Sequence, residues 1–267
     1  MASSFNIVRG LSSLAPRLSG KVAVVTASTD GIGYAIARRL AQEGAKVVIS
    51  SRKEKNVQKA LEKLHQDGLK ETIGLPCHVA NKEDRAKLFN LVSEKFGGLD
   101  ILVSNAAVNP AVGDVYDCPE DVWDKIFEVN VKAAFMLSKE AIPLLRKRGG
   151  GSIVYVSSIA GYQPISLLGA YSVSKTTLLG LTRVGSLDLA KDNIRVNCVA
   201  PGIIETKFSS ALTETESARE IVLNNVPMRR IGKPDEISGA VAFLCSDDAS
   251  YITGETILIT GGTPCRL

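Results

Sequence analysis

The sequence predicts an α/β protein with a doubly wound parallel sheet and helices on both of its faces. Short β-branched runs alternate along the chain with amphipathic segments of helical length, and a glycine-rich turn directly follows the first run. The chain has 267 residues and no linker rich in proline, glycine or serine, so we expect a single domain. Alternating strands and helices form βαβ units, and their right-handed crossovers place the strands in one parallel sheet.

Each element is predicted from its own residues. Apolar runs rich in valine and isoleucine predict about seven strands, at 21–26, 46–50, 72–77, 99–104, 152–157, 194–199 and 256–260. Between them, amphipathic periodicity predicts helices at 31–43, from about 54, from about 82, at 119–146, around Tyr171 and from 234. This order of elements is typical of a Rossmann-like fold.

The rhythm breaks at 203–230, where a polar insertion follows the sixth strand. The carboxyl edge of a doubly wound sheet is where ligands bind, so we interpret this insertion as a substrate lid. We therefore expect an N-terminal extension at 1–19, a domain at 20–262 that includes the lid, and a C-terminal tail at 263–267.

Composition excludes several classes of function. The net charge is only +4 and basic residues are dispersed among acidic ones, so we expect no nucleic acid partner. The five cysteines contain no Cys-x-x-Cys and only two histidines are present, which argues against a metal site and fits a reducing compartment. No apolar run reaches the roughly 20 residues of a membrane span.

The stretch TASTDGIG joins the first predicted strand to the first predicted helix. A glycine-rich turn in this position lets backbone N–H groups approach a pyrophosphate at a helix N-terminus. We therefore expect a dinucleotide to contact the residues of this turn, namely Ala27, Ser28, Thr29, Gly31, Ile32 and Gly33. Alanine at position 27 fits if its φ is negative.

The second strand ends in Ser50, Ser51 and Arg52, where a carboxylate would hydrogen-bond the adenosine ribose of NAD(H). Hydroxyl groups and a guanidinium can instead hydrogen-bond a 2′-phosphate with charge assistance. Ser51 and Arg52 therefore predict NADP(H) as the cofactor.

Tyr171 is the only one of six tyrosines with a lysine four residues later, Lys175. Residues four apart on a helix share a face, so the ammonium can lie near the phenol. A cation there lowers the pKa of a tyrosine from its ordinary value near ~10 and makes it a usable acid or base. Ser158 ends a predicted strand and Asn130 lies in a predicted helix.

Asn130, Ser158, Tyr171 and Lys175 match the active site of the short-chain dehydrogenase/reductase superfamily, which the chain resembles over about 20–262. The resemblance implies that Tyr171 exchanges a proton with a carbonyl or alcohol, Ser158 stabilises the oxygen, and Lys175 holds the nicotinamide ribose. It implies that Asn130 supports a proton-relay water. It adds these residues to the cofactor site: His78, Val79, Asn105, Pro201, Gly202, Ile204 and Thr206, with Tyr171 and Lys175.

Several positions of the chain depart from the superfamily pattern, among them Ser104 and Ala107 on either side of Asn105. Ala27 stands where a glycine is usual, and Cys77-His78 stand where an aspartate commonly meets the adenine. Longer stretches such as DILVSNAAVNP and FLCSDDASYITGET resemble a branch of NADPH-dependent retinol dehydrogenases and carbonyl reductases of animals. That resemblance implies retinal, aromatic ketones and α-dicarbonyls as substrates, and a homotetramer.

We expect a mainly apolar substrate site, suited to a bulky carbonyl. Its expected residues are Ser158, Tyr171, Val108, Asn109, Tyr162, Leu167, Leu168 and the lid. Two alternatives stay open. A 3-ketoacyl thioester reductase would need a basic patch near the lid, where Arg229 and Arg230 stand, and a non-catalytic NADPH-binding sensor or scaffold would tolerate a broken active site.

The two ends of the chain carry competing address signals. Cys265, Arg266 and Leu267 are similar to the serine-lysine-leucine peroxisomal signal, so we expect the peroxisomal import receptor as a partner. Residues 1–29 contain no aspartate or glutamate and are rich in serine, which is typical of organellar transit peptides. We expect a peroxisomal location, with the mitochondrion or cytoplasm as alternatives.

Overall fold

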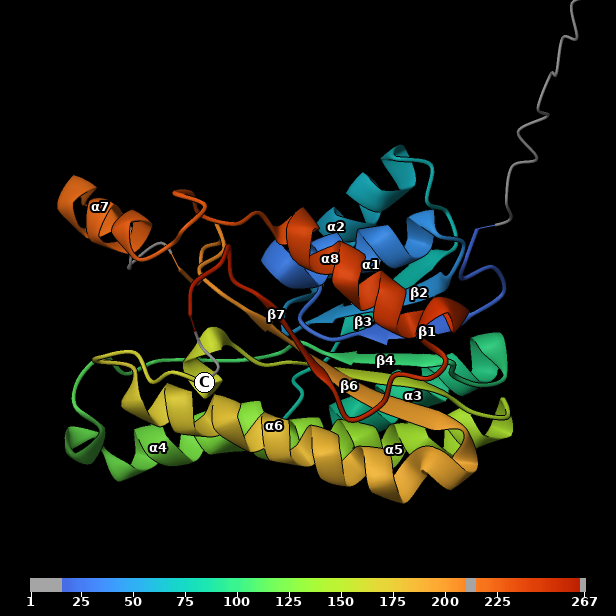
Figure 1. Cartoon of the computed structure of the whole chain (residues 1–267). Coiled ribbons are helices and arrows are strands. Elements are labelled where there is room, and N and C mark those ends of the chain that lie inside the picture. The colour runs from blue at the N-terminus through green and yellow to red at the C-terminus, as the bar shows by residue number, and fades with distance from the viewer. Residues whose placement is uncertain (1–15, 210–214, 265–267) are drawn as a thin grey trace, which may run out of the picture.

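A computed structural model describes residues 16–209 and 215–264 (Figure 1). Within them the strands are β1 (Val22–Val25), β2 (Lys46–Ser51), β3 (Thr72–Pro76), β4 (Ile101–Ser104), β5 (Gly151–Val156), β6 (Ile194–Pro201) and β7 (Thr256–Ile259). The α-helices are α1 (Gly31–Gln42), α2 (Glu54–Gln66), α3 (Lys82–Phe96), α4 (Glu120–Phe127), α5 (Ala133–Lys147), α6 (Gly169–Leu189), α7 (Glu216–Asn224) and α8 (Pro234–Cys245).

The strands form one parallel sheet in the order β3-β2-β1-β4-β5-β6-β7. The chain runs outward from β1 to β3 and then returns to the other side of β1, where β4 pairs with it in the register Val24 to Leu102. This reversal leaves a crevice beyond the carboxyl ends of β1 and β4, because the crossovers leave in opposite directions. The predicted doubly wound α/β fold is confirmed.

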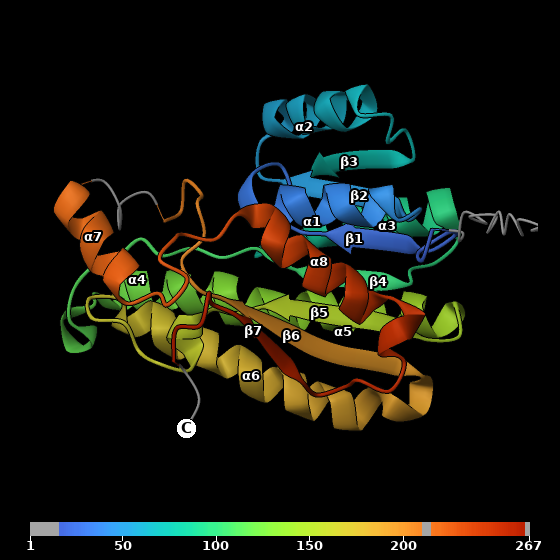
Figure 2. The ribbon, with the colours of Figure 1, turned by 45° about the horizontal axis from the view of Figure 1, so that its top comes forward.

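Helices cover both faces of the sheet (Figures 1 and 2). On one face α1, α2 and α8 pack on the strands through side chains such as Ile36, Leu64 and Val241. On the other face α3, α5 and α6 pack through side chains such as Leu88 and Leu137. Strand residues alternate between the two cores, and every residue of β1 is buried, as expected of a central parallel strand.

Two predicted segments differ from their expected form. The helical stretch expected at 119–146 is divided into α4 and α5 by one π-helical turn, Glu128–Lys132. Such turns insert an extra residue into a helix and often occur at functional sites. The insertion expected as a lid contains its own helix, α7, while 210–214 lie outside the described residues.

Candidate active site

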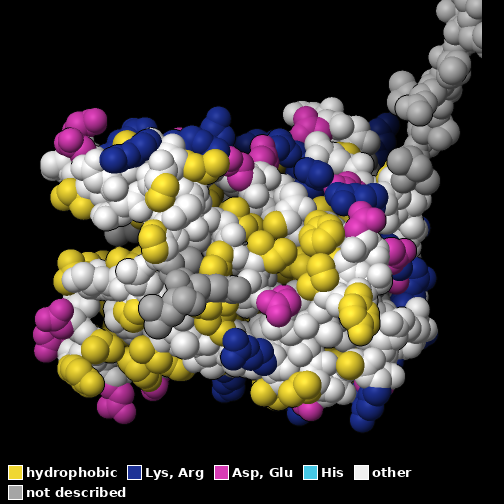
Figure 3. Space-filling view, in the orientation of Figure 1, with side chains coloured by type: hydrophobic (Ala, Val, Ile, Leu, Met, Phe, Trp, Pro, Cys, Tyr) yellow, Lys and Arg dark blue, Asp and Glu magenta, His cyan; other side chains and the backbone are white. Residues whose placement is uncertain are grey.

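A cavity of about 310 Å³ lies at the carboxyl edge of the sheet, where the strand order reverses. In the space-filling view the molecule is notched at its left edge, between the part that carries α7 and the part that carries α4 (Figure 3). The cavity is lined by Ala27, Asp30, Gly31, Ile32, Gly33, Asn105, Ala107, Val156, Ser157, Ser158, Ile159, Ile165, Leu168, Tyr171, Lys175, Pro201, Gly202, Ile203, Ile204, Thr206, Lys207, Phe208 and Ser209.

The predicted cofactor turn forms one wall of this cavity and is tied to the end of β4. The Asn105 side-chain amide donates to the carbonyl oxygens of Thr26 and Ala27, at 3.0 and 3.1 Å. The Thr26 hydroxyl in turn accepts from the Asn105 backbone N–H at 3.0 Å. A Cβ on Gly33 would lie only 2.4 Å from the Ala27 carbonyl oxygen, so only glycine permits this close approach.

Ala27 has a φ of +50°, so the expectation of a negative φ at this position is wrong. The left-handed region costs an L-residue about 1 to 2 kcal/mol, because Cβ crowds the following carbonyl oxygen. Fixed bonds on both sides of the turn impose this conformation, including the Asn105 amide bond to the Ala27 carbonyl. The turn therefore keeps its shape although a strained alanine replaces glycine.

Ser28 supports the turn from inside the protein. It is fully buried, its hydroxyl donates to the Val25 carbonyl at 2.6 Å, and the Ser50 N–H donates to it at 3.0 Å. Its own N–H donates to the Ser50 carbonyl. Both polar groups of Ser28 are thus engaged by the protein, and the turn meets the cavity through Ala27, Gly31, Ile32 and Gly33 instead.

The other predicted cofactor residues are divided between the cavity and its surroundings. Thr29, Ser51, Arg52, His78 and Val79 are not among the residues that line the cavity. Arg52 is exposed at the end of β2, and Val79 is buried. Asn105, Pro201, Gly202, Ile204 and Thr206 do line it, together with Tyr171 and Lys175.

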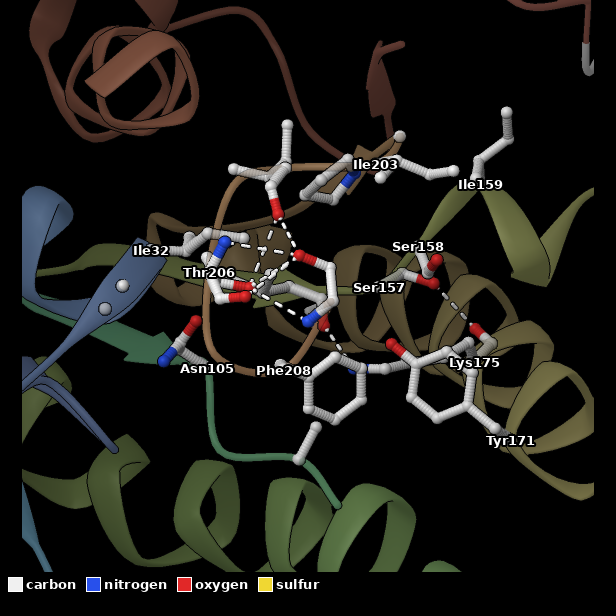
Figure 4. Close-up of a pocket in the computed structure, with 18 of the residues that line it drawn as sticks. Ile32, Asn105, Ser157, Ser158, Ile159, Tyr171, Lys175, Ile203, Thr206 and Phe208 are labelled. Carbon is white, nitrogen blue, oxygen red and sulfur yellow. Dashed lines mark hydrogen bonds between the residues drawn. The ribbon is translucent and has the colours of Figure 1, made fainter. Parts of the chain in front are cut away.

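Tyr171 and Lys175 project from the first turns of α6 toward Ser158, which follows β5 (Figure 4). The Lys175 Nζ lies 5.6 Å from the centroid of the Tyr171 ring and donates to the Val156 carbonyl at 2.8 Å. Tyr171 and Lys175 are almost fully buried. The predicted sharing of one helix face is therefore confirmed.

The expected lowering of the Tyr171 pKa is wrong for this structure. Burial raises the pKa of Tyr171 to about 12, although a hydrogen bond with the Ser158 hydroxyl lowers it. Burial also lowers the pKa of Lys175 to about 8, because a charged ammonium is poorly solvated there. At neutral pH the phenol is protonated, which is the form that can donate a proton.

Asn130 lies in the π-helical turn, next to the cavity but not in its wall. Its amide accepts from the Val108 N–H at 2.8 Å and donates to the Val108 carbonyl and to the Ser174 hydroxyl, both at 3.0 Å. The Ser174 hydroxyl donates to the Tyr171 carbonyl at 2.7 Å. Asn130 thus connects the segment after β4 to the helix that carries Tyr171, and its own side chain is fully hydrogen-bonded.

Sequence reasoning missed several residues of the site. Ser157 holds α6 in place, because its hydroxyl donates to the Lys175 carbonyl at 2.8 Å. Phe208 of the insertion packs against Tyr171, with ring centroids 5.6 Å apart. A serine pair at a strand end is a local signal for Ser157, but nothing in the sequence indicates which lid residue meets the tyrosine.

The expected substrate residues are only partly brought together. Ser158, Tyr171 and Leu168 line the cavity, whereas Val108, Asn109, Tyr162 and Leu167 do not. Leu167 is half exposed and has a φ of +67°, and only its neighbour Leu168 lines the cavity. The apolar wall is completed by Ile159, Ile165, Ile203 and Phe208, which were not predicted individually.

The remaining expectations concern a metal site, a membrane span and the address signals at the two ends of the chain. Among the described residues no group of three or more His, Cys, Asp or Glu side chains could hold a metal ion. In the same part of the chain no helix combines the length and apolar character needed to cross a membrane. The predicted signal Cys265-Arg266-Leu267 lies outside the described residues, as do 1–15 of the N-terminal extension.

Comparison with known proteins gives consistent matches over nearly the whole chain. A family model described as Enoyl-(Acyl carrier protein) reductase matches residues 26–264. Dehydrogenase/reductase SDR family member 4 of Oryctolagus cuniculus is 57% identical over 94% of this chain and 96% of its own. Tropinone reductase-like 3 of Erythroxylum coca is 51% identical over 94% of this chain and 96% of its own.

Among solved structures, a protein of Sinorhizobium meliloti 1021 described as a short-chain alcohol dehydrogenase is 36% identical. It superposes with a TM-score of 0.88, over 94% of this chain and 98% of its own. The similarity in sequence and the similarity in fold therefore each extend over nearly the whole chain.

Replacing Ala27 with glycine is expected to raise the free energy of unfolding by about 0.5 to 1 kcal/mol. Glycine removes the left-handed strain at φ +50°, and this gain exceeds its extra entropy in the unfolded chain. Urea denaturation measures the change. Ala37→Gly, in the buried interior of α1, is the matched control and should lose stability. An Ala27→Gly variant that is less stable than the parent would contradict the conclusion that the backbone at Ala27 is strained.

Proposed function

The chain belongs to the short-chain dehydrogenase/reductase superfamily and is an NAD(P)-dependent oxidoreductase; from this premise we propose that it reduces bulky carbonyl compounds with NADPH. The observation that carries the proposal is the position of the buried Tyr171, which forms a hydrogen bond with the Ser158 hydroxyl and lines a cavity with apolar walls. The reaction is reversible, with alcohol oxidation as its reverse.

The residues of the cavity fit a nicotinamide dinucleotide. Gly33 keeps the backbone bare at the N-terminus of α1, where a pyrophosphate is favourably placed. Ile204 and Thr206 follow the end of β6, line the same cavity and would hold the nicotinamide carboxamide. A nicotinamide cofactor bound there supplies the hydride in reduction and accepts it in oxidation.

Tyr171 and Ser158 act on the substrate oxygen. Ser158 donates a hydrogen bond to the carbonyl oxygen and so stabilises the negative charge that develops on it. Tyr171 gives its phenolic proton to the same oxygen as the alcohol forms. Its raised pKa keeps this proton in place until the oxygen becomes basic.

Lys175 supports the proton transfer from its position near the Tyr171 ring. Its ammonium lies 5.6 Å from the Tyr171 ring and stabilises the phenolate that remains after the proton leaves. In the same position it would hold the ribose of the cofactor. Because burial lowers its pKa to about 8, Lys175 can also supply a proton that restores the neutral phenol after each reduction.

The walls of the cavity favour retinal, aromatic ketones and α-dicarbonyls as the substrate class. Ile159, Ile165, Leu168 and Phe208 present hydrocarbon next to the proton donor. Burial of such groups against a bulky apolar substituent contributes about 25 cal/mol for each Å² removed from water. The names of the relatives agree with a reductase of carbonyls but do not define one substrate.

The alternative of a 3-ketoacyl thioester reductase has less support, because the basic groups near the lid are engaged. Arg230 pairs with Glu236 at 2.7 Å, and Arg229 donates to the Asn224 side chain at 2.6 Å. Neither lines the cavity. A non-catalytic sensor or scaffold is disfavoured by the intact set of Tyr171, Lys175 and Ser158.

NADPH is proposed over NADH because of the end of β2. Arg52 is exposed there beside Ser51, and no carboxylate of the described residues lies within ion-pairing distance of its guanidinium. The guanidinium can therefore hydrogen-bond a 2′-phosphate without breaking an existing ion pair.

We also propose a homotetramer and a peroxisomal location. Leu187 on α6 is 80% exposed and Val184 is 57% exposed, and this apolar surface supports association of subunits. The C-terminal Cys265-Arg266-Leu267 supports recognition by the peroxisomal import receptor.

Tyr171→Phe is expected to lower the rate of carbonyl reduction by a factor of about 10² to 10⁴, because the proton donor is lost and the ring is kept. Its affinity for NADPH should stay nearly unchanged. Purified enzyme is assayed by NADPH consumption against retinal, an aromatic dione and a 3-ketoacyl thioester. Activity within tenfold of the parent enzyme would remove Tyr171 from this role, and a preference for the thioester would overturn the substrate class.

Arg52→Ala should weaken NADPH binding by about 1.5 to 3 kcal/mol, the range of one hydrogen bond to a charged group. NADH binding should change little, since it carries no 2′-phosphate. Fluorescence titration with both cofactors measures the two effects. If both cofactors are weakened alike, Arg52 has a structural role and the NADPH assignment fails.

A fluorescent reporter that carries the last dozen residues should become punctate and colocalise with a peroxisomal marker. Deletion of Leu267 from the full chain should leave the protein in the cytosol, because the receptor reads a free C-terminal tripeptide. Entry of the truncated protein into mitochondria would instead assign the signal to the N-terminal segment.

A further inference from the structure

Two neighbouring side chains of the insertion reach opposite walls of the cavity (Figure 4). The Thr206 methyl group packs over Gly31 in the cofactor turn, where an added Cβ would lie 3.2 Å from it. The Phe208 ring lies over Tyr171, with centroids 5.6 Å apart. The segment therefore contacts the cofactor turn and the proton donor at once.

Lys207, which lies between these two residues in the sequence, forms an ion pair with Asp30 of the cofactor turn. Its Nζ lies 2.7 Å from Oδ2 of Asp30, a residue 177 positions earlier in the chain. Lys207 and Asp30 both line the cavity. Their side chains are 91% and 64% exposed, so the pair is reached by solvent and ions.

Residues 206–209 form a closed turn, so a contact at Lys207 restrains the whole segment. The Ser209 hydroxyl accepts from the Thr206 N–H at 3.2 Å and also donates to the Ile204 carbonyl. The Glu205 N–H donates to the Gly232 carbonyl at 2.8 Å, which anchors the start of the turn. In addition to this anchor, the ion pair between Lys207 and Asp30 connects the 206–209 turn to the start of α1.

The charge of Asp30 explains why a lysine is useful opposite it. Asp30 caps α1 and accepts the Gly31 N–H at 2.9 Å. Its carboxylate thus stands at the helix N-terminus where the cofactor phosphates are expected, and an uncompensated negative charge there would repel them. The Lys207 ammonium compensates this charge, and the same ion pair connects the 206–209 turn to the start of α1.

We propose that Lys207 and Asp30 form an electrostatic clasp, in which Lys207 is a positioning residue that holds the 206–209 turn over the cavity and slows release of the cofactor. The proposal rests on the proposed function only for the identity of the cofactor. Because both groups are solvent-exposed, the clasp is weak and is screened by salt, so its loss should change rates by only about 1.5-fold to 5-fold.

The first test follows hydrogen exchange of the protein alone, in a peptide that covers 203–209. Lys207→Gln and Asp30→Asn should each speed exchange of its amides about 1.5-fold to 5-fold at low salt, while Lys207→Arg should retain the parent rate. In 0.5 M salt the parent should approach the rate of Lys207→Gln. The control is Lys46→Gln, which breaks an exposed 3.8 Å pair with Glu71 away from the cavity. Equal exchange in parent, Lys207→Gln and Asp30→Asn would overturn the clasp.

The second test measures NADPH release by stopped-flow fluorescence in a double-mutant cycle. Lys207→Gln should speed release in the parent background and speed it clearly less in the Asp30→Asn background, because the pair with Asp30 is already broken there. An equal effect in both backgrounds would mean that Lys207 acts through a contact other than Asp30, and the clasp would be wrong. If the parent binds neither NADPH nor NADH, the proposed function fails, while hydrogen exchange still decides on the clasp.

Discussion

The attachment of the cofactor turn to the end of β4 is the constraint on which the site depends. One side chain, Asn105, donates to two successive carbonyl groups of the turn, and Gly33 leaves room for the backbone to approach. The same attachment forces Ala27 into the left-handed region. A loose turn would widen the cavity and lose the alignment of α1, whose N-terminus faces it.

Burial sets the chemistry on the other wall. Tyr171 and Lys175 share a face of α6, and both are removed from water, so burial raises the pKa of the phenol and lowers the pKa of the amine. The two pKa values thereby move apart, in the direction that leaves a protonated donor beside a readily deprotonated base. Asn130 and Ser157 keep this helix in position through bonds to the Ser174 hydroxyl and to the Lys175 carbonyl.

Much of the fold and part of the site could be predicted, for reasons that differ between residues. The strands were found because buried parallel strands are nearly continuous apolar runs, as in β1. The pair of Tyr171 and Lys175 was found because helical spacing is local. The π-helical turn at Asn130 was missed, because one extra residue in a helix leaves no periodic signal in so short a stretch. The sign of φ at Ala27 was missed, because a hydrogen bond to residue 105 imposes it.

The sequence alone determined what depends on neighbours along the chain. This covers the order of strands and helices, the glycine-rich turn, the common helix face of Tyr171 and Lys175, and the absence of an acid at positions 50–52. Tertiary structure decided what depends on segments far apart. It placed Phe208 on Tyr171, joined Lys207 to Asp30, and excluded Val108 and Leu167 from the cavity wall. The reason is physical, since burial and pairing arise from the packing of distant segments, whereas local periodicity records only which side of an element is apolar.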